Sequence, residues 1–262
     1  MPLTDYKESE IAGFVDALAQ RAKSPREWGL LHIFPRRTAT PNLRELKMYL
    51  AHNFGEADAC ILLTDDEKSL FICAKNDSGK LTGFFDNQML GAHPMEKIEI
   101  VAHTLNEKGI DYIATTLERL AGPDNTFAKM GLIRLRRRSN VFMILDDDPM
   151  VLKQLEFMAS RLGRVEVFSN AEDFILAYKR FAPNAIIVDI HLRGARGTNV
   201  PTLLQTRIDP YVHTIMISAD VQEEAIIEAK MKGAKGYISK PVSNEMLMKQ
   251  VFQAPTFVQR MN

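Results

Sequence analysis

The sequence predicts an α/β protein of two domains, an α+β domain in residues 1–138 and a doubly wound five-stranded parallel sheet in residues 139–262. Three observations predict this division. The chain has 262 residues, enough for two ordinary domains, and 46% of them are apolar, which is typical of chains that bury full cores. From Asn140 onward, short apolar strands alternate regularly with amphipathic stretches of helix length, and the first half lacks this alternation.

The composition narrows the class of protein. The chain has 33 Lys plus Arg and 33 Asp plus Glu, so no net field draws it to nucleic acid or to an anionic membrane. We therefore expect no DNA partner and no membrane partner. The two cysteines, Cys60 and Cys73, lie inside apolar runs, which favours a reducing compartment. Because no apolar stretch approaches the roughly 18 residues of a membrane span, a cytoplasmic location is expected.

The first domain is predicted to contain a leading helix and then a strand–helix–strand–strand–helix–strand unit. Apolar residues at i, i+3, i+4 and i+7 predict the leading helix over 6–21. The predicted strands are 30–34, 59–64, 70–74 and 132–136, of which the second and third form a hairpin. Helices are predicted over 43–54 and 104–121, and the segment 80–102 is consistent with helix or strand. This order is compatible with a split β-α-β sandwich of ferredoxin-like type.

The second domain is predicted from five short apolar strands. They are the runs at 141–145, 165–168, 185–188, 214–218 and 236–239. Such strands, joined by helical crossovers, form a parallel sheet that is covered on both faces. Ligands in this architecture bind at the carboxyl ends of the strands, near the point where the strand order reverses. The functional residues of the second domain are therefore expected at the carboxyl ends of its strands.

Residues suited to phosphoryl chemistry follow these strands. Asp146 and Asp147 come after the first strand and Asp189 after the third. Ser218 closes the fourth strand, and Lys240 comes just after the fifth. Carboxylates held together repel one another unless a hard divalent cation neutralises them, and oxygen ligands suit Mg²⁺. A phosphoryl group would need that cation, an ammonium and a hydroxyl around its oxygens, so the sequence predicts a magnesium-dependent phosphoryl site.

Four segments resemble the signatures of a known family. They are MetIleLeuAspAspAspPro, IleIleValAspIleHisLeu, IleSerAlaAsp and GlyTyrIleSerLysProVal, and they resemble the receiver domains of bacterial response regulators over nearly all of 141–252. The resemblance implies a flavodoxin-like fold. It also implies that Asp189 is the phosphoacceptor and that Lys240 and Ser218 are its partners in phosphoryl transfer. The metal ligands implied are Asp146, Asp147 and Asp189. The resemblance makes Tyr237 the switch aromatic residue. Asp148 stands at a position that is often acidic in the family and is not expected to be essential.

The resemblance, and the positions of residues near this site, lead to further expectations. His191 and Asp220 lie two residues beyond the acceptor aspartate and the strand-end serine, so both are predicted to influence dephosphorylation; the same positions are also consistent with solvated loop side chains. The Lys240–Pro241 peptide bond is predicted to be cis. The family usually has proline four residues after the acceptor, where this chain has Arg193. That departure removes no group that phosphoryl transfer requires.

The resemblance implies a two-component response regulator that accepts its phosphoryl group from a histidine kinase or a histidine phosphotransfer protein. Phosphorylation would regulate the N-terminal domain or a downstream protein partner. Formation of a homodimer is a further alternative. We expect no enzymatic activity beyond the receiver's own phosphorylation and dephosphorylation. Two alternatives stay open for the N-terminal domain. One is a nucleotide-signalling enzyme, for which no GlyGlyAspGluPhe-like signature is present, and the other is an RNA-binding module using sheet aromatics such as Phe71.

Overall fold

The computed structural model describes residues 4–53, 59–75, 97–192, 195–197, 199–220 and 222–258. The chain divides into two compact units, Met1–Arg136 and Arg137–Asn262, and each is described by itself. Within the described ranges, no helix combines the length and the apolar composition that crossing a membrane requires.

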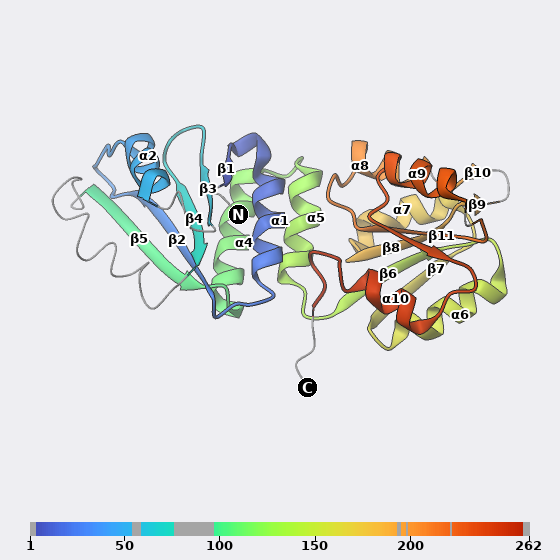
Figure 1. Ribbon diagram of the computed structural model, residues 1–262. Coiled ribbons are helices and arrows are strands. Elements are labelled where there is room, and N and C mark those ends of the chain that lie inside the picture. The colour runs from blue at the N-terminus through green and yellow to red at the C-terminus, as the bar shows by residue number, and fades with distance from the viewer. Residues whose placement is uncertain are drawn as a thin grey trace. The chain divides into compact units, whose positions relative to one another are not determined.

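The N-terminal unit is built on one mixed sheet (Figure 1). Its strands, in the order β1-β3-β4-β2-β5, are β1 (Thr4–Tyr6), β3 (Ala59–Leu63), β4 (Leu70–Lys75), β2 (Trp28–Pro35) and β5 (Ile98–Thr104). Its helices are the 3₁₀ turn η1 (Glu8–Glu10), α1 (Ile11–Arg21), α2 (Leu43–Asn53), α4 (Glu107–Ala121) and α5 (Thr126–Arg136). Because β4 lies between β2 and β3 and is antiparallel to both, the sheet has the predicted split β-α-β arrangement. Strand β1 extends the sheet, parallel to β3.

Helices cover both faces of this sheet (Figure 1). Helices α1, α4 and α5 pack on one face, where Phe14, Leu117 and Leu132 share one hydrophobic core. Helix α2 covers the other face and contributes Leu50 to a second core. Phe71, which an RNA-binding sheet would have to expose, is fully buried in the first core. The RNA-binding alternative therefore loses the aromatic residue on which it depended.

The prediction of a strand at 132–136 is wrong, because these residues form the end of α5. Alternating leucines and arginines gave this segment the period of a strand. In the fold, Ala128, Leu132 and Leu135 lie on one buried helical stripe, spaced by four and three residues, in the core that α1 shares. The last strand of the split motif is instead β5, which begins in the segment that was consistent with either structure. The helix predicted over 104–121 therefore follows the completed sheet.

The C-terminal unit contains the predicted five-stranded parallel sheet. In the order β12-β11-β8-β6-β7, its strands are β12 (Gly236–Ser239), β11 (Thr214–Ser218), β8 (Ala185–Asp189), β6 (Asn140–Leu145) and β7 (Gly163–Phe168). The helices are α6 (Pro149–Ser160), α7 (Ala171–Phe181), α8 (Asn199–Arg207), α9 (Glu223–Met231) and α10 (Asn244–Val251). The short strands β9 (His191–Leu192) and β10 (Ala195–Arg196) pair in the connection after β8.

The strand order of this sheet reverses between β6 and β8. From β6 the chain goes outward to β7 on one side, then returns to β8 on the other side and continues to β11 and β12. Helices α6 and α10 cover one face, and α7, α8 and α9 lie on the opposite side (Figure 1). The carboxyl ends of β6 and β8 therefore frame the point where ligands bind in this architecture.

The residues after α10 are hydrogen-bonded near the amino-terminal ends of β6 and β8, opposite the carboxyl ends of these strands. The side-chain amide of Asn140 donates to the carbonyl oxygen of Val258 at 2.9 Å, and the amide of Val258 donates back at 2.7 Å. The side chain of Asn184 donates to the carbonyl oxygen of Thr256 at 2.6 Å, while Phe257 joins the core under α6 and α10. This tail is therefore part of the folded unit.

Candidate functional site

Three carboxylates gather at the carboxyl ends of β6 and β8. Asp146 follows β6 directly and Asp189 ends β8, and their exposed fractions are 0% and 4%. Asp147 is half-buried. One oxygen atom from each of the three residues lies within 4.8 Å of the others. The fold brings them together because β6 and β8 are parallel neighbours, so the residues that follow their apolar runs emerge side by side.

One ammonium bridges the two most buried carboxylates. Lys240 Nζ donates to Asp146 Oδ2 at 2.8 Å and lies 3.2 Å from Asp189 Oδ2. The backbone amide of Lys240 donates to the carbonyl oxygen of Ser218 at 2.7 Å, which fixes the start of the loop after β12. The Lys240–Pro241 bond is cis, as predicted. The sequence prediction paired Lys240 with Asp189; the structure adds the shorter contact with Asp146.

The charges at this site are not balanced. Burial raises the pKa of Asp189; the charge of Lys240 lowers it, and the charge of Asp146 raises it again. Burial alone lowers the pKa of Lys240, but its hydrogen bond to Asp146 and the charge of Asp189 outweigh burial and leave that pKa raised. Lys240 therefore stays protonated at neutral pH. A single ammonium beside three carboxylates leaves an excess of negative charge, which favours binding of a cation.

Ser218 and Tyr237 are both joined to the backbone of Asp220. Ser218 is fully buried, and its Oγ accepts a hydrogen bond from the Asp220 amide at 3.0 Å. The hydroxyl of Tyr237 donates to the Asp220 carbonyl oxygen. The Asp220 carboxylate in turn accepts from the Gln222 amide at 2.9 Å, just before α9. A displacement of Ser218 would therefore also displace the hydrogen-bond acceptor of Tyr237.

The remaining residues named from the sequence stand around the acidic cluster. His191 is exposed, and its backbone amide donates to the Asp189 carboxylate. Asp148 caps α6 by accepting from the Met150 amide at 2.8 Å, and its own amide donates to Asp146 Oδ1 at 2.9 Å. The sequence prediction missed this orienting role, although an aspartate before Pro149 is a recognisable helix start. Arg193 lies outside the described residues.

The unit that holds this site matches a known protein family. Residues 142–252 match the family described as the response regulator receiver domain. These residues are a receiver domain. The match lies entirely within the C-terminal unit, so this unit is the part of the chain that carries the receiver domain.

Relatives of the receiver domain include proteins named as response regulators. TodT of Pseudomonas putida is 30% identical over 119 residues, which are 45% of this chain and 52% of TodT. The nitrate/nitrite response regulator NarL of Escherichia coli is 32% identical over 116 residues, 43% of this chain and 53% of NarL. The sensory/regulatory protein RpfC of Xanthomonas campestris is 32% identical over 115 residues, 42% of this chain and 16% of RpfC. The chain thus spans about half the length of TodT and NarL and far less of RpfC.

Solved receiver-domain structures are also similar to part of the chain. The BeF3-activated DrrB receiver domain is 26% identical, covers 44% of this chain and 96% of its own, and superposes with a TM-score of 0.40. A CheY-like receiver from Methanospirillum hungatei is 23% identical, covers 45% of this chain and 94% of its own, and has a TM-score of 0.41.

Proposed function

We propose that this chain is a response regulator in which Asp189 accepts a phosphoryl group from a histidine kinase or a histidine phosphotransfer protein. The observation that carries the proposal is the contact of Lys240 Nζ with both Asp146 and Asp189 at the carboxyl edge of the receiver sheet. A protonated lysine beside an aspartate that ends a strand provides a nucleophile and a cation for the incoming phosphoryl oxygens. We also propose a cytoplasmic location.

The acidic cluster fits a resident Mg²⁺ ion. Asp146, Asp147 and Asp189 offer three carboxylate oxygens within 4.8 Å of one another, and hard oxygen ligands with an excess of negative charge suit this ion. When bound, Mg²⁺ would neutralise negative charge on the transferring group. Asp148, whose amide bonds Asp146, would keep that ligand oriented.

The receiver's own residues support each part of the transfer. An Asp189 carboxylate oxygen would form the new P–O bond while the P–N bond to the donor histidine breaks, and the released imidazole nitrogen retains its electron pair and can take up a proton. Lys240 and the hydroxyl of Ser218 would contact the phosphoryl oxygens. Ser218 would then move toward the phosphoryl group, and Tyr237, joined to the Asp220 backbone, would follow. Water entering past His191 and Asp220 would hydrolyse the acyl phosphate, and these two side chains would tune its lifetime.

The signal is proposed to regulate the N-terminal unit or a separate protein partner, since the family match lies within the receiver half of the chain. We propose no enzymatic activity for the whole protein other than phosphorylation and dephosphorylation of the receiver. We propose neither DNA binding nor formation of a homodimer.

Hydrogen exchange of the intact chain with and without a phosphoryl group would distinguish regulation of the N-terminal unit from regulation of a separate protein partner. Changes in residues 4–53 and 97–136 indicate intramolecular regulation, and changes confined to the receiver indicate an external partner.

Phosphorylation is tested by incubating the full chain with acetyl phosphate and Mg²⁺ and measuring the intact mass. One phosphoryl group is expected on the wild type, none on Asp189→Asn, and none when a chelator removes Mg²⁺. The matched control is Asp148→Asn, which makes the same change at an adjacent aspartate outside the three-carboxylate cluster and should still be labelled. Labelling of Asp189→Asn, or labelling that survives the chelator, would contradict the proposal.

A further inference from the structure

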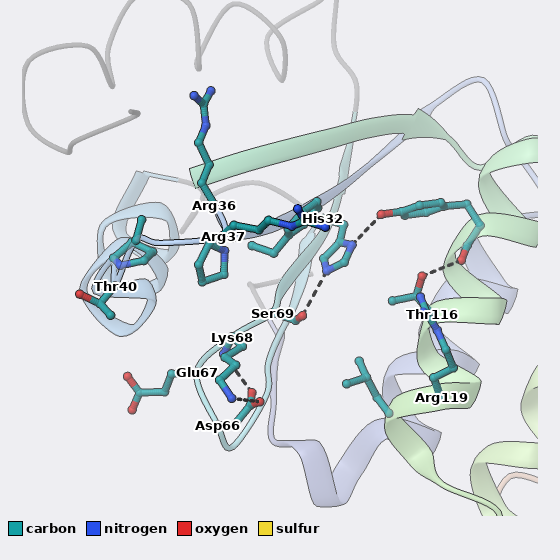
Figure 2. A pocket seen from close by; sticks show the side chains of 16 residues that line it. His32, Arg36, Arg37, Thr40, Asp66, Glu67, Lys68, Ser69, Thr116 and Arg119 are labelled. Atoms are coloured by element: carbon teal, nitrogen blue, oxygen red, sulfur yellow. Dashed lines mark hydrogen bonds and ion pairs between the residues drawn. The ribbon is translucent and has the colours of Figure 1, made fainter. Parts of the chain in front are cut away.

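A cavity of about 840 Å³ opens in the N-terminal unit, outside the receiver (Figure 2). Three segments line it: the end of β2 with the following loop (32–41), the turn between β3 and β4 (66–69), and one face of α4 (112–120). Its volume lies in the range of pockets that hold small organic ligands. The family match does not extend to this unit, and the phosphoryl site does not use it.

The floor of the cavity, formed by His32 with Tyr112 and Ser69, is polar and uncharged, and hydrogen bonds hold its side chains in place. His32 is only 7% exposed, and its Nδ1 and Nε2 hydrogen-bond the hydroxyls of Tyr112 at 2.7 Å and Ser69 at 3.2 Å (Figure 2). Burial, together with the charge of Arg119, lowers the pKa of His32 to about 4. His32 is therefore neutral at physiological pH, and the floor can exchange hydrogen bonds with an uncharged polar group.

The acidic residues in the lining are already paired. Asp66 lies 3.5 Å from Lys68 Nζ and also accepts hydrogen bonds from the Thr64 hydroxyl and the Lys68 amide. Glu67 forms an ion pair with Arg44, which stands outside the lining, at 2.6 Å. These carboxylates therefore do not neutralise the arginines of the cavity.

Two arginines of the lining keep their charge for a ligand. Within the part of the chain that the structure describes, no carboxylate pairs with Arg37 or with Arg119. Figure 2 shows Arg37 extending toward His32 and Arg119 on α4 below Thr116. Arg36 extends away from His32, and its Nε donates to the Ile98 carbonyl oxygen. Unpaired guanidinium groups at a cavity mouth favour an oxyanion, and two of them suit a doubly charged phosphate better than a carboxylate.

Part of the cavity wall is apolar. Phe34, Pro35, Pro41 and Leu120 line the cavity and are each half-buried, so they leave apolar surface open to it. Phe34 also packs its ring against His32, with centroids 4.8 Å apart. Such walls suit a flat, largely apolar ring rather than an inorganic anion.

We propose that this cavity binds a small organic phosphate with a planar ring, of about mononucleotide size. Arg37 and Arg119 supply the positive charge for the phosphate, the apolar walls contact the ring, and a polar edge of the ring reaches the His32 floor. The N-terminal unit thereby gains a ligand of its own. Since the site shares no residue with the acidic cluster, it stands or falls separately from phosphorylation of Asp189.

The test is calorimetric titration of the full chain with two probes, adenosine monophosphate and phenyl phosphate. A chelator is present throughout, so that Mg²⁺ cannot recruit phosphate to the receiver. Both probes are expected to bind, and adenosine, which lacks the phosphate, should bind about tenfold more weakly or not at all. Arg37→Gln combined with Arg119→Gln should weaken both phosphates by about tenfold or more, because charge-assisted bonds are lost.

The matched control is Arg26→Gln, which removes the same charge from an exposed position of the same unit outside the lining. It should leave both affinities unchanged, and urea unfolding followed by Trp28 fluorescence verifies that every variant is folded. Failure of both probes to bind at about millimolar concentration would overturn the proposal. It would also be overturned if the double variant bound them as tightly as the wild type, or if Arg26→Gln weakened them equally.

Discussion

Two buried titratable groups show how burial acts at the residue scale. Asp189 and His32 each lose solvent, and in both cases burial favours the neutral form, so the pKa of the carboxyl rises and the pKa of the imidazole falls. Their surroundings then differ. Lys240 partly compensates Asp189, whereas Arg119 adds to the effect of burial on His32. The first arrangement places a buried carboxyl group beside a cation, and the second keeps an imidazole uncharged.

The pKa of His32 makes the stability of the N-terminal unit depend on pH. The unfolded chain takes up a proton on this residue near pH 6.5 and the folded chain only near about 4, so between these values the unfolded state binds more protons. Stability is fully present above the unfolded pKa and is lost as pH falls through this window. From about pH 7.5 to about pH 5, the expected loss through His32 is about 2 kcal/mol.

Urea unfolding followed by the fluorescence of Trp28, the only tryptophan, measures this loss in the intact chain. His32→Gln should lose less stability than the wild type over the same pH interval, by about 2 kcal/mol. The control is His52→Gln, which replaces an exposed histidine of the same unit and should keep the wild-type pH dependence. Identical pH dependence in the wild type and His32→Gln would refute this account of His32.

At the scale of elements, the N-terminal helices pack more closely than their sequences indicate. Gly131 lies in the middle of α5, where a glycine costs about 1 kcal/mol of helix stability relative to alanine. A Cβ atom at this position would lie 2.8 Å from Cγ1 of Val15 on α1. The glycine therefore allows α1 and α5 to approach each other above the sheet.

Gly131→Ala is expected to destabilise the N-terminal unit although alanine is the better helix former. Val15 is fully buried and stiff at its branched Cβ, so it cannot move aside, and the helices have to separate. The expected net loss is about 1–2 kcal/mol in urea unfolding. Val15→Ala supplies the missing room, so the double variant should lose less than the sum of the two single losses. Additive losses would show that the two residues do not compete for the same space.

At the scale of the whole molecule, each unit has its own hydrophobic core, and the boundary falls between Arg136 and Arg137. The sequence interpretation placed this boundary after residue 138. The structure assigns Arg137 to the receiver unit, because its guanidinium donates to the carbonyl oxygens of Ala182 and Phe181 at 2.7 and 2.6 Å. These bonds satisfy carbonyls at the end of α7.

The fragment 137–262 is expected to fold alone and to unfold cooperatively, since a complete sheet, both helical layers and the closing tail lie within it. The matched fragment 138–262 lacks only Arg137 and should be less stable by about 1–2 kcal/mol, because two charge-assisted hydrogen bonds are lost. Urea unfolding followed by circular dichroism compares the two. Equal stability of the fragments would mean that Arg137 contributes nothing to the receiver fold.

The sequence by itself determined the receiver half of this protein. Its strands are continuous apolar runs, as a sheet buried on both faces requires, and its polar residues come directly after these runs. Parallel pairing then leaves little freedom in where Asp146, Asp189 and Ser218 emerge, so their proximity followed from the strand order. The cis bond at Lys240–Pro241 was predicted from the same segments.

Only the tertiary structure decided the rest. The segment 132–136 has the alternation of a strand, and it is helical because its leucines complete a stripe against α1 that a local pattern does not reveal. The contact of Lys240 with Asp146 and the cavity above His32 also join residues far apart in the chain. Such features depend on long-range packing, which neither spacing nor propensity records.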